Sequence, residues 1–468
     1  MSLSPVSSLA AAGLVLAAAS ASPLLANGIR VADNAGAPTF TSLQAAIDAA
    51  PDGGLLLVQS GTYGAAVVDG KSLSIVEMPG AITKTTGTLR IQNLSASQRV
   101  LVSGLEILGV GAPGVVLQDN VGTARLQGCK ITGGRVSVTW DSDRGESGIE
   151  AHAAAQVVLV DCQVFGGDAF NYSGTPPQPG GHGLSAVDSY LALYDCAVRG
   201  GEGGVEGNPT GGDGGDGVRV DDWGIFASGC TFRGGNGGGG DYIGCNGGGL
   251  GGDALQLEAA QAALLDVTLT AGPGGWDSCG PPAPGGTTIQ NNGGVVSLVP
   301  GTRRKLAAAA LSSDDGLLTI TATGQPGESF YLVRSWSTFF AYQGQWHGVW
   351  TLPWLSAVHA RGVIPPSGVL VMQVRTPTLV GIDHRLELLQ GFCVDASDQR
   401  YLTGPVHVEH LDAAGGPDCD ASGVNDFVQL IGGAPDCDRN VNLDACDIAG
   451  GSSQDANMNG IPDECPGG

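Results

Sequence analysis

One phrase recurs along this chain, as "ARLQGCKITGG" (124–134), "VVLVDCQVFGG" (157–167), "LALYDCAVRGG" (191–201) and "IFASGCTFRGG" (225–235). The copies are centred on Cys129, Cys162, Cys196 and Cys230. Two further copies place Leu105 and Val267 in the cysteine position, so the successive spacings are 24, 33, 34, 34 and 37 residues. Self-similarity at a nearly fixed period indicates a repeat architecture.

Within each copy, apolar residues alternate on both sides of a polar corner. Leu191 and Leu193 precede the corner at Asp195, and Cys196 and Val198 follow it. A 24-residue unit with short strands and no helix is too short for a βαβ crossover, so the repeat predicts a coiled parallel sheet. Stacked coils place the cysteine positions in an internal ladder about 4.8 Å apart. We expect the four ladder cysteines to be free thiols, with disulfide-paired rungs as the alternative.

The additional residues of the later units all follow the Gly-Gly pair, so the insertions share one side of the coil. His182, Asp216 and Asp253 occupy equivalent positions just before the next strand. We expect these aspartates to bond loop amides. The alternative is a calcium-dependent lyase site built from Asp213, Asp216, Asp241 or Asp253, with Arg199, Arg219 or Arg233 as the base.

The start of the repeat region is an amphipathic helix followed by a buried strand. The segment "FTSLQAAIDAAPDGGLLLVQSGTY" (40–63) predicts a helix that ends before Pro51 and covers the open end of the coil. The order of helix, turn, apolar strand and "GTY" resembles the N-terminal part of proteins of the pectin lyase-like superfamily. The resemblance covers about residues 31 to 300. The resemblance implies a right-handed parallel β-helix. That superfamily holds lyases, hydrolases, esterases and inactive surface proteins, so it implies no single activity.

Composition and charge restrict the partners. The chain has 468 residues, 79 of them glycine, and a formal net charge of −24, which excludes nucleic acid and anionic membranes and favours cations. Residues 1–26 predict a secretory signal peptide, although no Lys or Arg precedes Arg30, and we expect no transmembrane span in the mature chain. We therefore expect a secreted or cell-surface protein in which disulfides can form. Cys245 and Cys279, on successive glycine-rich insertions, predict one disulfide.

The pattern divides the mature chain into three parts: a Gly-rich β-helix (27–300), a β-sandwich with longer strands (301–412) and an Asp/Asn/Cys-rich tail (413–468). Trp223, Tyr242 and Trp276 could stack on sugar rings, as could the aromatic stretch 339–354, with ordinary packing as the alternative. His407 and Glu409 fall on one face of a strand that we expect to be exposed.

The tail contains three nine-residue phrases with oxygen-bearing side chains at positions 1, 3, 5 and 9. This is the spacing with which an EF-type loop binds calcium. The phrases resemble thrombospondin type 3 or dockerin-type loops, although none has Glu at position 12 and the second has Val441 where glycine belongs. The expected ligands are Asp418, Asp420, Ser422 and Asp426; Asp436, Asp438, Asn440 and Asp444; Asp455, Asn457, Asn459 and Asp463. The alternative is a metal-free tail in which Cys419, Cys437, Cys446 and Cys465 form one of three disulfide pairings.

The sequence thus predicts an all-β, secreted protein with a calcium-binding tail. The leading functional interpretation is non-catalytic carbohydrate binding or adhesion, with an extracellular polysaccharide or cell-surface component as partner. The alternative is a polysaccharide lyase or glycoside hydrolase that acts on acidic polysaccharides.

Overall fold

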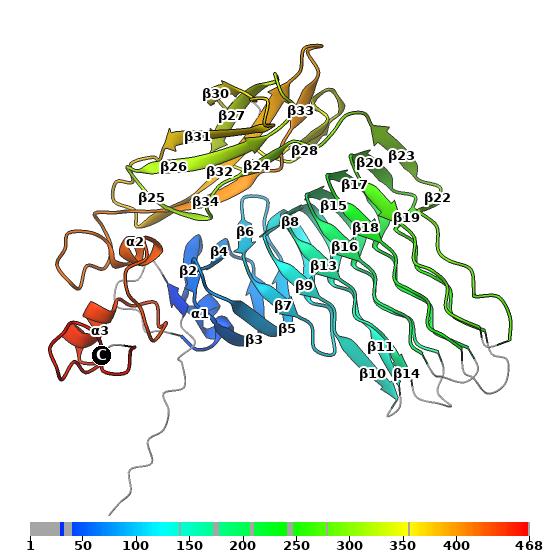
Figure 1. The fold of residues 1–468 in the computed structure, drawn as a ribbon, viewed down its shortest axis with the longest axis horizontal. Helices are drawn as coiled ribbons and strands as arrows, with labels where there is room; N and C mark the ends of the chain where they lie inside the picture. The colour runs from blue at the N-terminus through cyan, green and yellow to red at the C-terminus, as the bar shows by residue number, and fades with distance from the viewer. Residues whose placement is uncertain are drawn as a thin grey trace, which may run out of the picture.

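The computed structural model describes residues 29–31, 40–139, 142–171, 177–205, 210–240, 247–277, 279–353 and 356–466. The first half of the chain winds into coils whose strands stack in parallel, so the predicted parallel β-helix is confirmed (Figure 1). The predicted signal peptide, Tyr242 and Cys245 lie outside the described residues. No helix among the described residues is long and apolar enough to cross a bilayer.

Three parallel sheets form the faces of the β-helix, and several long strands bend at a corner to serve two faces. Face 1 contains β2 (Gly54–Val58), β4 (Leu73–Glu77), β6 (Arg99–Ser103), β20 (Gln261–Leu265), β23 (Val295–Val299) and the second halves of β8 (Val115–Gln127), β12 (Ile149–Val160), β15 (Leu184–Tyr194) and β17 (Val218–Ser228). β1 (Ile29–Val31) adds to β2 in the antiparallel direction.

Face 2 contains the first halves of β3 (Gly61–Asp69) and β5 (Thr83–Gln92), followed by β7 (Glu106–Leu108), β9 (Lys130–Thr132), β13 (Gln163–Phe165), β16 (Ala197–Arg199), β18 (Thr231–Arg233) and β21 (Thr268–Thr270). Face 3 contains the remaining halves of the long strands together with β19 (Leu255–Glu258) and β22 (Ile289–Asn292). A small antiparallel sheet of β10 (Arg135–Thr139), β11 (Ser142–Gly145) and β14 (Phe170–Asn171) extends the first insertions.

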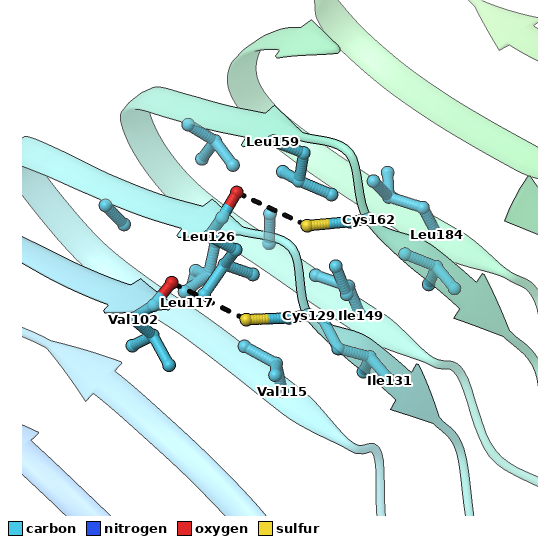
Figure 2. Close-up of a cluster of buried hydrophobic side chains, with 14 of the residues drawn as sticks. Val102, Val115, Leu117, Leu126, Cys129, Ile131, Ile149, Leu159, Cys162 and Leu184 are labelled. Atoms are coloured by element: carbon cyan, nitrogen blue, oxygen red, sulfur yellow. Dashed lines mark hydrogen bonds between the residues drawn. The ribbon is translucent and has the colours of Figure 1, made fainter. Parts of the chain in front are cut away.

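The core of the β-helix is a stack of inward side chains, one layer per coil. Cys129, Cys162, Cys196 and Cys230 are buried and free, as expected, and their neighbours in the stack are Val, Leu and Ile. Figure 2 shows the thiols of Cys129 and Cys162 donating to the carbonyl oxygens of Val102 and Leu126, at 3.5 and 3.3 Å. The ladder therefore satisfies its weak donors without disulfides.

The residue before each ladder position makes the corner. Asp161, Asp195 and Asp266 have φ of 53°, 54° and 54°, and glycines take the same left-handed conformation in the other coils. Asp and Gly tolerate this conformation best, which explains why the repeat alternates between them.

Helix α1 (Leu43–Ala49) covers the first coil. Leu43, Ala46 and Ile47 pack on the core, and the Ser42 side chain accepts from the Ala45 amide at the helix N-terminus. Lys71 Nζ donates to the carbonyls of Ile47 and Ala50, which closes the other end of the helix. The predicted cap is confirmed.

The glycine-rich insertions form an ordered layer beside the β-helix rather than loose loops (Figure 1). Hydrogen bonds of 2.7 to 2.9 Å run from strand to strand, in the series Gly181 to Gly167, Gly201 to Gly181, Gly215 to Gly201, Gly235 to Gly215 and Gly252 to Gly235. Along one strand, the amides that bond to residues 270–276 recur every third residue, at Gly234, Gly237 and Gly240, and those that bond to residues 212–215 are Gly235 and Gly238, also three apart. Three residues per turn and bonding only between strands are the properties of polyproline II helices. We call this structure the glycine layer; it comprises residues 166–171, 177–183, 200–205, 210–217, 234–240, 247–254, 271–277 and 279–288.

Close packing explains why this layer needs glycine. A Cβ on Gly215 would lie 2.0 Å from the Gly181 oxygen, and a Cβ on Gly201 would lie 2.0 Å from the Gly167 oxygen. The glycines of this layer are thus a packing requirement, as in the collagen triple helix.

The second half of the chain is a β-sandwich, as expected. One sheet contains β24 (Lys305–Ala307), β26 (Leu317–Thr323) and β31 (Val369–Arg375). The other contains β25 (Leu311–Ser313), β27 (Ser329–Ser335), β30 (Val358–Val363), β32 (His384–Val394), β33 (Arg400–Leu402) and β34 (Val406–Leu411). The short hairpin of β28 (Ala341–Gln343) and β29 (Gly348–Trp350) flanks them, with the 3-10 turn η1 (Gly344–Trp346) between its strands.

The sandwich lies on face 1 of the β-helix (Figure 1), and β34 forms part of the contact. Arg125 Nη1 lies 2.7 Å from His407 Nε2, and the Gln127 side-chain oxygen lies 3.2 Å from His407 Nδ1. His407 and Glu409 are each 1% exposed, so the expectation of an exposed strand was wrong. The reason is tertiary: β34 is covered on both faces, which an isolated strand pattern cannot show.

The tail returns to the first coils and completes the cover of face 1. Helices α2 (Asp426–Ile431) and α3 (Asp444–Gly450) belong to a cluster in which Phe427 and Leu430 meet Leu55 and Leu57. Gln59 Nε2 also donates to Asp436 Oδ2 at 3.1 Å. Disulfides join Cys419 to Cys446 and Cys437 to Cys465, which selects one of the three possible pairings.

Candidate functional site

An apolar groove lies at the seam between the last coils of the β-helix and the sandwich. Its volume is about 170 Å³, and β15, β17, β20 and β23 form one wall, while Phe340, Tyr342 and Val349 form the other. Tyr190 and Tyr342 are 47% and 45% exposed at its rim. We call this feature the seam groove.

Aromatic rings surround the seam groove. Trp223, which is 43% exposed, packs against Tyr190 with 4.8 Å between ring centroids and 35° between the ring planes. Phe226 belongs to the β17 wall, and its ring lies 5.8 Å from the ring of Tyr342 on the other wall. Exposed rings with nearby polar groups, here the side chains of Gln261 and Ser297, form an amphipathic surface that suits the faces of sugar rings.

The lining of the seam groove contains no Asp, Glu, His, Lys or Arg. Its titratable groups are Tyr190 and Tyr342, and burial raises the pKa of the Tyr342 hydroxyl above its usual value. Glycoside hydrolysis needs a pair of carboxyl groups, and proton abstraction needs a base that is active near neutral pH. The seam groove can therefore bind a ligand but lacks the groups for acid–base chemistry.

A second cavity, of about 400 Å³, lies where face 2 meets the glycine layer, and it does contain charged groups. Lys130, Arg135, Arg199 and Asp168 line it. Arg199 pairs with Glu202 at 2.6 Å, and Asp168 Oδ1 accepts from the Glu202 amide at 2.8 Å. Arg199 and Asp168 are therefore already engaged with Glu202, whereas a catalytic acid or base would need to face the substrate.

The repeated His/Asp position is a hydrogen-bond ladder along the glycine layer. The Asp216 amide donates to His182 Nδ1 at 3.1 Å, and the Asp253 amide donates to Asp216 Oδ1 at 2.9 Å. Asp253 Oδ1 in turn accepts from the Thr287 amide at 2.6 Å. Each side chain thus joins its coil to the next, which is the loop-bonding role expected from the sequence. Asp213 does the same for the Leu250 amide, and Asp241 lies outside the described residues.

The three tail loops share one backbone geometry. In each, the position 1 aspartate accepts from the amides at positions 5 and 6: Asp418 from Ser422 and Gly423, Asp436 from Asn440 and Val441, Asp455 from Asn459 and Gly460. The position 9 residues, Asp426, Asp444 and Asp463, accept from the amide of position 2. Position 6 has φ of 80°, 62° and 81°, so Val441 adopts the conformation of the glycines.

The first loop brings three carboxylates close together. Ligand atoms of Asp418, Asp420 and Asp426 lie within 4.8 Å of one another, and among the described residues this is the one cluster of three carboxylates compatible with a metal ion. In the second loop, burial raises the pKa of Asp436 to about 7; the hydrogen bond from Gln59 opposes this rise, and the neighbouring Asp438 adds to it. In the third loop, asparagines at positions 3 and 5 reduce the charge. Oxygen donors in an EF-type turn fit a hard cation such as calcium.

Position 12 is the element that the sequence analysis missed. Gln429 Nε2 lies 2.9 Å from Ser422 Oγ and 3.2 Å from the Val424 carbonyl, so this side chain faces the oxygens of the first loop. The two ends of a glutamine amide are distinguished by their hydrogen bonds, and rotation would present Oε1 to a cation. In the second loop Asp447 occupies the same position and accepts from Asn440 Nδ2 at 3.1 Å. The signal was the side chain eleven residues after Asp418 and Asp436, because Gln and Asp can replace the usual Glu; the third loop has Pro466 at this position.

Comparisons with known proteins identify no family. No protein-family profile and no curated protein match the chain. Among solved structures, the chain is similar to tailspike protein 2 of the Escherichia coli O157:H7 bacteriophage CAB120, with 8% identity, 81% of this chain and 67% of that chain covered, and a TM-score of 0.29. It is also similar to pectate lyase Pel9A, with 13% identity, 47% and 63% covered, and a TM-score of 0.19.

A further match is the superoxide reductase (neelaredoxin) of Ignicoccus hospitalis, with 8% identity, 23% of this chain and 80% of that chain covered, and a TM-score of 0.16. With TM-scores this low, these likenesses carry no argument about function. The chemistry must be argued from this chain's own residues.

Proposed function

We propose that this chain is a non-catalytic carbohydrate-binding protein that takes a neutral saccharide in the seam groove. The observation that carries the proposal is the composition of the groove: exposed aromatic rings with a few polar groups and no charged side chain in its lining. An extracellular polysaccharide is the partner that such a surface fits. The net charge of −24 disfavours an anionic ligand, so a neutral glycan is preferred over the acidic polymers considered from the sequence.

Binding of neutral polysaccharides, measured by affinity electrophoresis and calorimetry, tests this proposal. An aromatic contact is worth about 0.5–1.5 kcal/mol beyond its buried area, so Tyr190→Ala and Tyr342→Ala should each weaken binding by up to about tenfold. Trp276→Ala is the matched control, because Trp276 is 47% exposed but lies outside the groove lining. Equal losses in all three variants, or no binding by the wild type, would reject the proposal.

The catalytic alternative has a separate assay. A lyase acting on uronic-acid polymers releases unsaturated products that absorb in the ultraviolet. Sustained turnover that Arg199→Ala abolishes would place chemistry in the second cavity and would overturn the non-catalytic assignment.

We further propose that the tail loops bind calcium. The shared loop geometry, the three carboxylates of the first loop and the position 12 side chains support this proposal. A bound cation would stabilise the tail and, through Gln59 and the cluster around Phe427, its contact with the first coils.

Calorimetric titration with calcium and thermal unfolding test this second proposal. We expect the wild type to bind calcium and to melt at a higher temperature, and Asp418→Asn to lose the first-loop site. Asp48→Asn is a suitable control, because Asp48 is an exposed aspartate of α1, away from the loops. A wild type without calcium-dependent heat or stabilisation would show that the tail is held by its disulfides alone.

A further inference from the structure

The two ends of the β-helix differ, and the difference identifies an interaction surface. The first coil is covered by α1, whose Leu43, Ala46 and Ile47 fill the end of the core. The last coil has no equivalent cover in the part of the chain that the structure describes. None of the residues 279–302 is buried, whereas the inward residues of the preceding coil, among them Leu255, Leu257 and Leu264, are buried.

The last coil presents apolar side chains and open strand edges. Leu298 points along the same core direction as Leu264, its partner in the pairing of β20 with β23, but it is 74% exposed. Ile289 and Val296 are only partly buried against the core. β21, β22 and β23 each pair with one described strand, so their outer edges carry free hydrogen-bonding groups. Open edges of this kind add further strands.

The absence of charged residues from the last coil indicates which partner binds there. Residues 278–302 contain no Asp, Glu, Lys, Arg or His, in a chain whose net charge is −24. Two copies of so acidic a chain repel each other over most of their surface, but not where both are uncharged. A second copy can therefore approach the end coil without charge repulsion.

We propose that the exposed end coil is a homodimer interface, in which the last coils of two copies stack end to end about a two-fold axis. That axis, perpendicular to the β-helix axis, makes the strands of the two copies antiparallel and buries Leu298 of both. Because α1 blocks the opposite end, the contact closes at two copies and does not continue into a fibre. Val295 and Ser297 of the same coil line the seam groove, so the two grooves of a dimer lie near the interface.

The mass of the full mature chain in solution tests this proposal. Sedimentation velocity from 1 to 100 µM should show a dimer of twice the mass of one mature chain. Leu298→Glu should give a folded monomer, because each copy then places a carboxylate in the apolar contact. Asn291→Glu, at an exposed polar residue of the end coil, gives a second variant that removes no apolar side chain. Val380→Glu is the control, since Val380 is 85% exposed in the sandwich.

The possible results separate clearly. A wild-type dimer that both end-coil variants dissociate and the control preserves supports the proposal, as does slower amide exchange in β21, β22 and β23 at dimeric concentrations. A monomeric wild type at 100 µM, assemblies longer than a dimer, or a dimer that persists in Asn291→Glu would overturn it. Sugar binding by a monomer would leave the proposed function standing, so the two proposals fail independently.

Discussion

Alanine at Gly215 should destabilise the protein far more than a glycine substitution in an ordinary loop. The new Cβ would lie 2.0 Å from the Gly181 oxygen and 2.5 Å from the Gly181 carbonyl carbon, where contacts of at least about 3 Å are needed. The two strands must therefore separate by about 1 Å. The backbone conformation is not the obstacle, because Gly215 does not have a positive φ.

The magnitude follows from the contacts that the separation breaks. Overpacking a close-packed site costs about 1–3 kcal/mol. Gly215 also donates to the Gly201 oxygen at 2.9 Å, and its own oxygen accepts from Gly235 at 2.7 Å. Each of these hydrogen bonds contributes about 1 kcal/mol net. We expect a total loss of about 3–5 kcal/mol.

Thermal and guanidinium unfolding of the full chain, followed by circular dichroism, measure this loss. Gly239→Ala is the control, because the nearest atom to its added Cβ is 3.9 Å away, and it should unfold like the wild type. If Gly215→Ala and Gly239→Ala unfold at the same midpoint, the close packing of the glycine layer does not stabilise the protein and the reasoning fails.

Three further results are expected. The fold favours neutral His407, because burial and then the Arg125 and Arg99 charges hold its pKa well below the ordinary 6.5. Stability should therefore fall as the pH drops below about 6.5, by up to about 1.4 kcal/mol per pH unit, and the slope measured by pH-dependent unfolding should decrease in His407→Gln. Phe427→Ala should cost about 3–5 kcal/mol and release the tail, seen as faster proteolysis after residue 412; an unchanged cleavage rate would mean that the cluster with the first coils is not needed for docking. The four ladder thiols should not react with a thiol reagent until the protein unfolds, since all four are buried; modification of any of them in the native state would contradict the sealed core.

The β-helix could be predicted from sequence because its information is local and repeated. Every coil has the same alternation of apolar residues on both sides of its corner. Aligning the copies therefore gives the register at Cys162 and Cys196. The end helix could be predicted for the same reason, from the spacing of Leu43, Ala46 and Ile47 before Pro51.

The seam groove could not be predicted, because its walls come from segments about 150 residues apart. Tyr190 and Tyr342 meet only because the sandwich lies on face 1, and no local pattern encodes that docking. Burial of His407 and Glu409 escaped prediction for the same reason. The glycine layer was anticipated only as a set of insertions on one side, because a polyproline II strand has no alternation of apolar side chains to reveal it.

The cover of face 1 has a consequence for biosynthesis. The coils can form in order as the chain emerges from the ribosome. Leu55 and Leu57 of the first coils, however, stay uncovered on their outer side until Phe427, some 370 residues later, has been made. Until then a newly made chain carries an apolar stripe along its whole β-helix, and a chain cut short within the sandwich keeps it permanently. Early release or premature termination should therefore produce aggregating products rather than smaller working proteins. The apolar outer surface of the first coils is thus covered only after the tail has been made and has docked.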